Sequence, residues 1–124
     1  MLKILFSPSE GKRQGGQYPP INELLFHLDN RNEILEEYNK IVLSSDTDAL
    51  QKMFGIKKEQ DLQRYKTDIF NSLTCKAIER YTGVAYKYLN IRTLGLNAHE
   101  YLEKNTIIFS NLYGPLLGGD LNYL

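Results

Sequence analysis

The sequence has few of the residues that build disulfides or metal sites. It contains one cysteine, two histidines and no tryptophan in 124 residues. A single cysteine, Cys75, cannot form an internal disulfide, which fits a reducing compartment. His27 and His99 have no Cys or His partner at the spacing of zinc ligands. We therefore expect no metal site and no cofactor.

Long apolar runs are absent as well. The apolar start at Met1–Phe6 is stopped by Ser7-Pro8, whereas a secretory signal needs about 7–15 apolar residues. No stretch approaches the roughly 18 apolar residues that span a bilayer. These absences predict a cytoplasmic location and no membrane partner.

The chain also lacks a net charge of either sign, because fifteen Lys and Arg balance fifteen Asp and Glu. This balance excludes a strongly basic nucleic-acid binder as a description of the whole chain. The charges are nevertheless unevenly spread: residues 21–51 carry a net charge of −5 and residues 52–92 carry +5. The basic middle is either a set of solvated helix faces or a surface that faces phosphate.

Length and hydrophobic patterning predict one domain of the α+β class, mainly helical with a small mixed sheet. At 124 residues the chain is long enough to bury a core without disulfides or metal. Apolar, β-branched runs predict strands near 2–6 and 106–110, of which we expect the first to be central. Segment 76–81 fits either a strand or a helix. Apolar periodicity predicts helices at 21–43, with a break near Asp29-Asn30, and at 49–54, 58–71 and 97–104, the last capped by Asn97 with Glu100. Residues 83–89 fit a short helix or a turn.

The loop after the first strand is one candidate site. Ligand sites of α/β proteins lie at the carboxyl ends of strands, and Lys12 and Arg13 can pair with phosphate. We expect this loop to lie beside Tyr113, which follows the second strand, if the two strands are parallel neighbours. The pattern predicts an enzyme or binding module for a small phosphorylated or nucleotide-like ligand, or else only a flexible polar loop. The candidate ligand residues are Ser7, Ser9, Glu10, Lys12, Arg13 and Tyr113.

Residues 49–65 supply a second candidate, because two apolar-periodic segments flank Gly55-Ile56-Lys57-Lys58. This pattern is similar to a helix-hairpin-helix, in which hairpin amides lie against a nucleic-acid backbone. Contacts of this kind read phosphate and not sequence. An ordinary turn between two helices would give the same pattern. The candidate DNA-binding residues are Gly55 and Ile56 through their amides, and Lys57, Lys58, Lys52 and Arg64 through their charge.

Three segments together resemble the YaaA peroxide-stress protein family. They read MLKILFSPSEGKR at Met1–Arg13, AIERYTGVAYKYL at Ala77–Leu89, and IIFSNLYGPLLGGDLNY at Ile107–Tyr123. Their order and spacing also agree with the family. One departure is Asn111, where the family usually has glycine. Family members run to roughly twice this length, so we interpret the chain as the N-terminal half of a longer protein.

The resemblance implies a cytosolic protein that helps cells to survive hydrogen peroxide by limiting free iron and oxidative DNA damage. It also implies a mixed fold with a helix-hairpin-helix and a positively charged cleft that binds DNA. It implies no catalysed reaction, and no catalytic constellation stands out in the sequence. A truncated chain is expected to expose apolar surface and to self-associate. A further alternative is that the fragment is inactive by itself.

Overall fold

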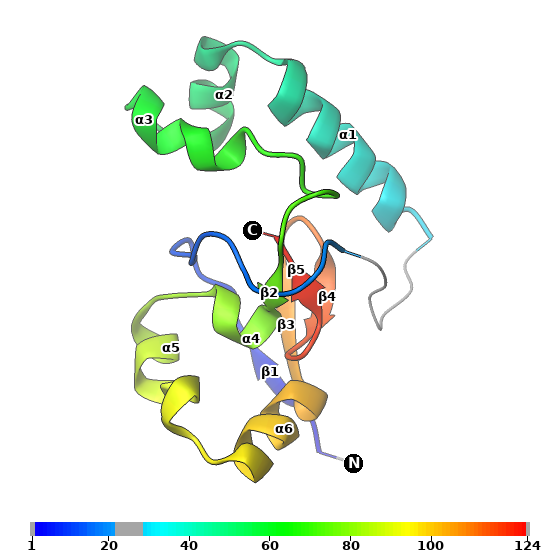
Figure 1. The fold of residues 1–124 in the computed structure, drawn as a ribbon, viewed down its shortest axis with the longest axis vertical. Coiled ribbons are helices and arrows are strands. Elements are labelled where there is room, and N and C mark those ends of the chain that lie inside the picture. The colour runs from blue at the N-terminus through cyan, green and yellow to red at the C-terminus, as the bar shows by residue number, and fades with distance from the viewer. Residues whose placement is uncertain (1, 22–28, 124) are drawn as a thin grey trace.

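The computed structural model describes residues 2–21 and 29–123, and its elements confirm the α+β class (Figure 1). A helical layer of α1 to α3 lies on one side of the strands, and α5 and α6 lie on the other. Two short 3-10 turns, η1 and η2, follow α3 and α5. The helices are α1 Arg31–Ser44, α2 Thr47–Phe54, α3 Glu59–Leu62, α4 Ala77–Arg80, α5 Val84–Leu89 and α6 Leu96–Asn105; the 3-10 turns are η1 Gln63–Tyr65 and η2 Ile91–Thr93. The strands are β1 Ile4–Phe6, β2 Cys75–Lys76, β3 Thr106–Ser110, β4 Gly114–Leu117 and β5 Leu121–Asn122.

The main sheet has three strands in the order β1-β3-β4. β1 runs parallel to β3, with Ile4 opposite Thr106 and Phe6 opposite Ile108, while β4 is antiparallel to β3. The prediction of a central first strand is therefore wrong, because β1 is an edge strand and β3 is paired on both sides. This difference matches burial: Ile108 is fully buried in β3, whereas Leu5 in β1 is 66% exposed. A second sheet pairs β2 with β5.

The first two helices follow from local chemistry. α1 starts after Asn30, near the break that the sequence predicts, and the earlier part of the expected 21–43 helix, including His27, lies outside the described residues. α2 confirms the helix expected at 49–54 and starts two residues earlier. It starts there because the Asp46 carboxylate accepts a hydrogen bond from the Ala49 amide at 2.7 Å. It ends at Gly55, which adopts the left-handed conformation with φ of 67°.

The predicted helix at 58–71 is wrong in its second half, because α3 and η1 end at Tyr65. Beyond that point Asp68 competes for the backbone. Its carboxylate accepts hydrogen bonds from the Phe70 amide at 3.0 Å and from Asn71 Nδ2 at 2.7 Å. Such local side-chain bonds stabilise turns at the expense of helices. The Asn39 side chain also holds this turn against α1, since its Oδ1 accepts from the Ile69 amide at 2.9 Å.

The remaining elements agree more closely with the sequence. β3 has the predicted bounds, and segment 83–89, which fits a short helix or a turn, forms the helix α5 from Val84 onward. The ambiguous segment 76–81 divides between β2 and α4. α6 is present, but its cap is not Asn97, because Gly95 occupies the N-cap position and provides no side-chain hydrogen bond. None of the helices in the described part of the chain has the length and apolarity that crossing a membrane requires.

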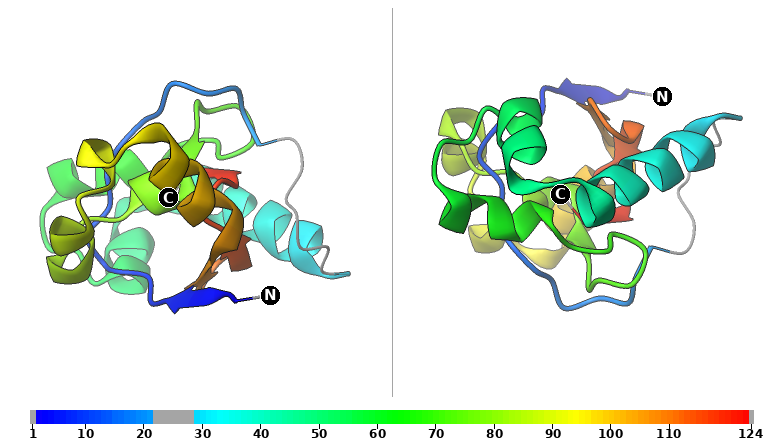
Figure 2. Two further views of the ribbon diagram at one scale, coloured as in Figure 1. Left: turned by 90° about the horizontal axis from the view of Figure 1, so that it is seen from below. Right: turned by 90° about the horizontal axis from the view of Figure 1, so that it is seen from above.

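Residues 11–18, which we call the strap, run around the periphery of the molecule after β1 (Figure 2). The strap is held by backbone hydrogen bonds, from the Arg13 amide to Arg80 O at 2.7 Å and from the Tyr18 amide to Thr74 O at 3.0 Å. Gly16 is needed for this close approach, since a Cβ there would lie 1.9 Å from Thr74 O. The strap therefore follows a fixed path over the segment that leads into β2 and α4.

Candidate functional site

A cleft of about 790 Å³ opens where β1 and β3 end. Its walls come from three parts of the chain: the loop after β1, the residues after β3, and the helical layer. The parallel pairing of β1 and β3 brings the first two together, as the sequence predicts. The lining residues are Pro8 to Lys12, Ser110 to Leu112, Tyr38, Phe54, Gly55, Arg64, Tyr65 and Tyr81.

The loop on one side of the cleft is fixed by its own hydrogen bonds. The Ser9 hydroxyl lies 2.7 Å from Gly11 O and 2.6 Å from Thr82 O, and it donates to this pair of carbonyls. A Cβ on Gly11 would lie 2.4 Å from the Thr82 hydroxyl. Ser9 therefore shapes the loop through bonds within the protein, and its hydroxyl proton is not free for a ligand.

Two cations line the cleft, Lys12 from the strap and Arg64 from η1, and both also line a small neighbouring cavity. Burial, and then the charge of Arg64, lower the pKa of Lys12, while Glu10 acts in the opposite direction. Within residues 2–21 and 29–123 neither cation forms an ion pair with a carboxylate. An anion in the cleft would relieve the repulsion between the positive charges of Lys12 and Arg64, so the arrangement favours phosphate or carboxylate ligands.

Aromatic rings form the wall beside Arg64. Phe54 and Tyr65 stack with centroids 4.4 Å apart and planes at 21°. The Arg64 guanidinium lies 4.7 Å over the Tyr65 ring, and its Nη2 donates to the Tyr65 hydroxyl at 2.5 Å. Tyr38 meets Phe54 edge-on, and burial raises the pKa of its hydroxyl. The wall therefore holds a cation next to flat apolar surface.

Three of the predicted ligand residues lie elsewhere. The Ser7 carbonyl accepts a hydrogen bond from the Tyr86 hydroxyl at 2.5 Å. Arg13 lines the cavity between α4 and α5 and, together with Lys12 and Arg64, a much smaller one, but it is not among the lining residues of the cleft. Tyr113 is 1% exposed and donates its hydroxyl to Tyr123 O at 2.5 Å, so it packs inside the core. Ser9, Glu10 and Lys12 do line the cleft. Six further lining residues were not predicted from the sequence, although the last two lie at the end of β3 as the loop lies at the end of β1: Tyr38, Phe54, Tyr65, Tyr81, Ser110 and Asn111.

Lys52, in the last turn of α2, and Lys57 and Lys58, between α2 and α3, are exposed. The amides of Gly55 and Ile56 both donate to Gln51 O, the second at 3.0 Å. Both amides that we expected to face phosphate thus donate to a carbonyl of α2. The donors that remain exposed at this turn are the side-chain amines of the lysines. A groove of about 480 Å³ runs along the hairpin and shares three residues with the cleft. The shared residues are Gly55, Arg64 and Tyr65.

Comparison with known proteins gives one family and several relatives. The sequence model of the family described as peroxide stress protein YaaA matches residues 2–121. An uncharacterized protein of Campylobacter jejuni is 40% identical over 123 residues, which cover 96% of this chain and 50% of that protein. A UPF0246 protein of Fusobacterium nucleatum is 31% identical over 123 residues, which cover 97% of this chain and 49% of that protein. The chain thus spans about half the length of these relatives.

Proposed function

Because the chain belongs to the family of peroxide stress protein YaaA, we propose that it is the DNA-binding part of a protein that limits oxidative damage. It binds the phosphate backbone through the hairpin between α2 and α3 and through the cleft beside it. The whole protein acts in the cytoplasm, where the DNA is, and limits free iron there, as the resemblance implies. The chain also self-associates through its exposed sheet face.

One observation supports the DNA proposal above the others: the cleft and the hairpin groove adjoin and share Gly55, Arg64 and Tyr65. Lys12 and Arg64 line the cleft, and Arg64 and Lys57 line the groove beside Asp61. A row of cations suits a backbone with regularly spaced phosphates, and the aromatic wall suits a sugar or base beside it. Backbone contacts of this kind predict similar affinity for different sequences.

A small phosphorylated ligand is the second candidate for the same cleft. It is favoured by the position of Lys12, which is partly buried and faces Arg64 rather than the exposed hairpin. Salt dependence separates the two candidates. Binding that tracks several phosphates weakens steeply as salt rises, because it releases many counterions, whereas one enclosed ion pair changes less.

The test compares two double variants that reverse the same number of charges. Lys57→Glu with Lys58→Glu changes the hairpin, and Lys40→Glu with Lys104→Glu changes exposed lysines that line neither the cleft nor the groove. Fluorescence anisotropy of labelled duplex DNA is measured over a salt series. We expect the hairpin variant to bind more weakly, with a salt slope shallower by about one for each lost phosphate contact.

Equal affinity and equal slope for the hairpin variant and the control would contradict the DNA proposal. Unchanged thermal stability in both variants is the folding control, since exposed substitutions usually shift stability by no more than ~0.5 kcal/mol. A Lys12→Gln variant extends the test to the cleft. Loss of binding in Lys12→Gln alone, with little salt dependence, would favour the small phosphorylated ligand.

A further inference from the structure

A second cavity of about 540 Å³ lies between α4 and α5 and adjoins the cleft at Tyr81, which lines both. It is formed mostly by the second of the three family-like segments, Ala77–Leu89, and by Arg13 from the first. The strap is bonded to this segment by the Arg13 amide and by the Thr82 amide, which donates to Gly11 O at 2.9 Å. Beyond Arg13, the lining residues are Ile78, Glu79, Tyr81 to Val84, Tyr86, Lys87 and Asn90 to Arg92.

The floor of this cavity is apolar and fixed. Ile78, Tyr86 and Ile91 are 1%, 8% and 8% exposed, and all three belong to the hydrophobic core. Tyr86 is held by a ring contact with Phe6, at 4.6 Å between centroids, and by its hydroxyl bond to Ser7 O. Asn90 ends α5 in the left-handed conformation, with φ of 45°, and the chain turns there toward Arg92. The floor therefore presents a preformed apolar surface.

The rim of the same cavity is cationic. Arg13, Lys87 and Arg92 are exposed, and within the described ranges their side chains form no hydrogen bond or ion pair. Glu79 is the one carboxylate among the described lining residues. Three cations around one carboxylate leave an excess of positive charge.

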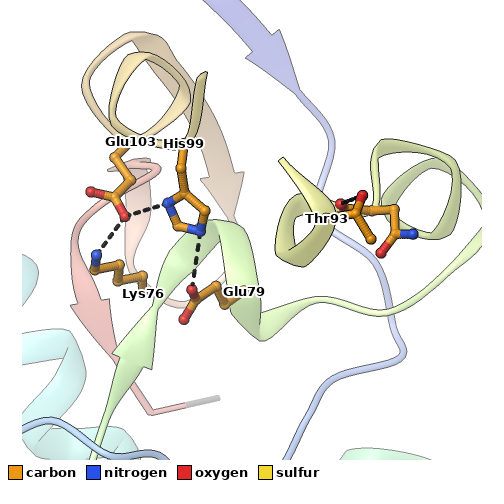
Figure 3. A network of polar contacts seen from close by, with 6 residues as sticks. Lys76, Glu79, Thr93, His99 and Glu103 are labelled. Atoms are coloured by element: carbon orange, nitrogen blue, oxygen red, sulfur yellow. Dashed lines mark hydrogen bonds and ion pairs between the residues drawn. The ribbon is translucent and has the colours of Figure 1, made fainter. Parts of the chain in front are cut away.

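The Glu79 side chain points toward His99 and belongs to a polar network with His99, Glu103 and Lys76 (Figure 3). Its Oε1 lies 3.5 Å from His99 Nε2, and His99 Nδ1 lies 2.9 Å from Glu103 Oε1. Lys76 Nζ donates to the same Glu103 oxygen at 2.5 Å. The carboxylate of Glu79 is thus positioned by His99, and the three rim cations are available to a ligand.

We propose that this cavity binds a small organic anion with a flat apolar body. The body lies on Ile78, Tyr86 and Ile91, and the anionic group is bound by the guanidinium groups of Arg13 and Arg92 and by Lys87. Guanidinium groups bind both phosphate and carboxylate with two parallel hydrogen bonds, and the volume is in the range of small-molecule sites. The site adjoins the cleft at Tyr81 but has its own lining cations, so its occupancy can be tested apart from the proposed DNA binding.

The test uses four probes that separate the two halves of the recognition. Phenyl phosphate and benzoate combine a ring with an anion, inorganic phosphate has the anion alone, and benzyl alcohol has the ring alone. Each probe is titrated into the ¹⁵N-labelled chain, and amide chemical shifts are followed by NMR. We expect phenyl phosphate or benzoate to shift the amides of Lys87, Asn90 and Arg92, with the single-feature probes about tenfold weaker or more.

The variant Lys87→Gln with Arg92→Gln tests the rim, and Lys57→Gln with Lys58→Gln is the matched control. The rim variant should weaken the combined probes by about tenfold, and the control should bind as the wild type does. The relative affinity of phenyl phosphate and benzoate identifies the anionic group. The proposal is overturned if no probe binds, if the shifts map to Gly55, Arg64 and Asn111 in the cleft, or if inorganic phosphate alone binds equally well.

Discussion

Replacing Arg80 by methionine tests how the ends of the chain are held together. Arg80 is 1% exposed. Its Nη1 donates to Arg13 O at 2.6 Å, its Nη2 to Asn122 O at 2.5 Å, and its Nε to Asn122 Oδ1 at 3.3 Å. The guanidinium also lies 5.6 Å over the Tyr123 ring. One side chain from α4 therefore bonds both the strap and β5.

The expected loss follows from these acceptors. Methionine is close to arginine in length but has no donor, so three oxygens lose their partner. Each buried acceptor left without a partner costs about 1–3 kcal/mol. Removing the buried guanidinium charge itself recovers some desolvation energy. We therefore expect Arg80→Met to lower the free energy of unfolding by about 3 kcal/mol, or about 12 °C in Tm at roughly 4 °C per kcal/mol.

Urea and thermal unfolding followed by circular dichroism measure this loss. Arg80→Lys keeps the charge but lacks the planar fork that reaches all three oxygens, so its stability should lie between wild type and Arg80→Met. Arg92→Met, at an exposed position, controls for the loss of a cation and should change stability by no more than ~0.5 kcal/mol. If Arg80→Met costs less than about 1 kcal/mol, the three hydrogen bonds do not hold the strap and β5.

Two further outcomes are expected. Hydrogen bonds, first from Asn71, lower the pKa of Asp68, so this carboxylate stabilises the fold above its unfolded pKa of about 3.9. The stabilisation is lost as the pH falls through the lowered pKa of the folded state. In urea titrations between about pH 6 and 3, the free energy of unfolding of Asp68→Asn should therefore depend less on pH than that of the wild type. Leu5 and Phe109 lie on one face of the sheet and are 66% and 49% exposed. The chain should therefore self-associate in sedimentation experiments, and the double variant Leu5→Lys with Phe109→Lys should self-associate less. A compact wild-type monomer at high concentration would contradict this expectation.

Elements decided by local chemistry were predictable from the sequence. The apolar, β-branched run of β3 and the Gly55 stop of α2 lie where the pattern places them. Elements for which side chains compete with the helix for backbone amides were less predictable from the sequence. The pattern of 58–71 favours a helix, but the Asp68 carboxylate binds backbone amides there instead. A one-dimensional pattern cannot weigh that competition, because the outcome also depends on Asn39 from α1.

The candidate site shows the same division. The proximity of the loop after β1 to the end of β3 follows from the parallel pairing of these strands, and Ser9, Glu10 and Lys12 line the cleft there. Lys12 and Arg13 line one small cavity together, but Arg13 is not among the lining residues of the cleft. Arg64 lies near Lys12 only because of where η1 packs in the fold. The spacing of the two residues in the sequence does not predict this proximity.

The parallel pairing of β1 with β3 also bears on how the chain folds as it is made. Ile4 pairs with Thr106, 102 positions later. At about 5–20 residues per second, β3 is synthesised roughly 5–20 s after β1. During that time the first strand has no partner in the sheet, although α1 and α2 can already form from local contacts. Sheet formation must therefore wait for nearly all of this chain, and such non-local pairing is slow. Newly made protein would pass through a helical intermediate in which the apolar N-terminus is available to chaperones.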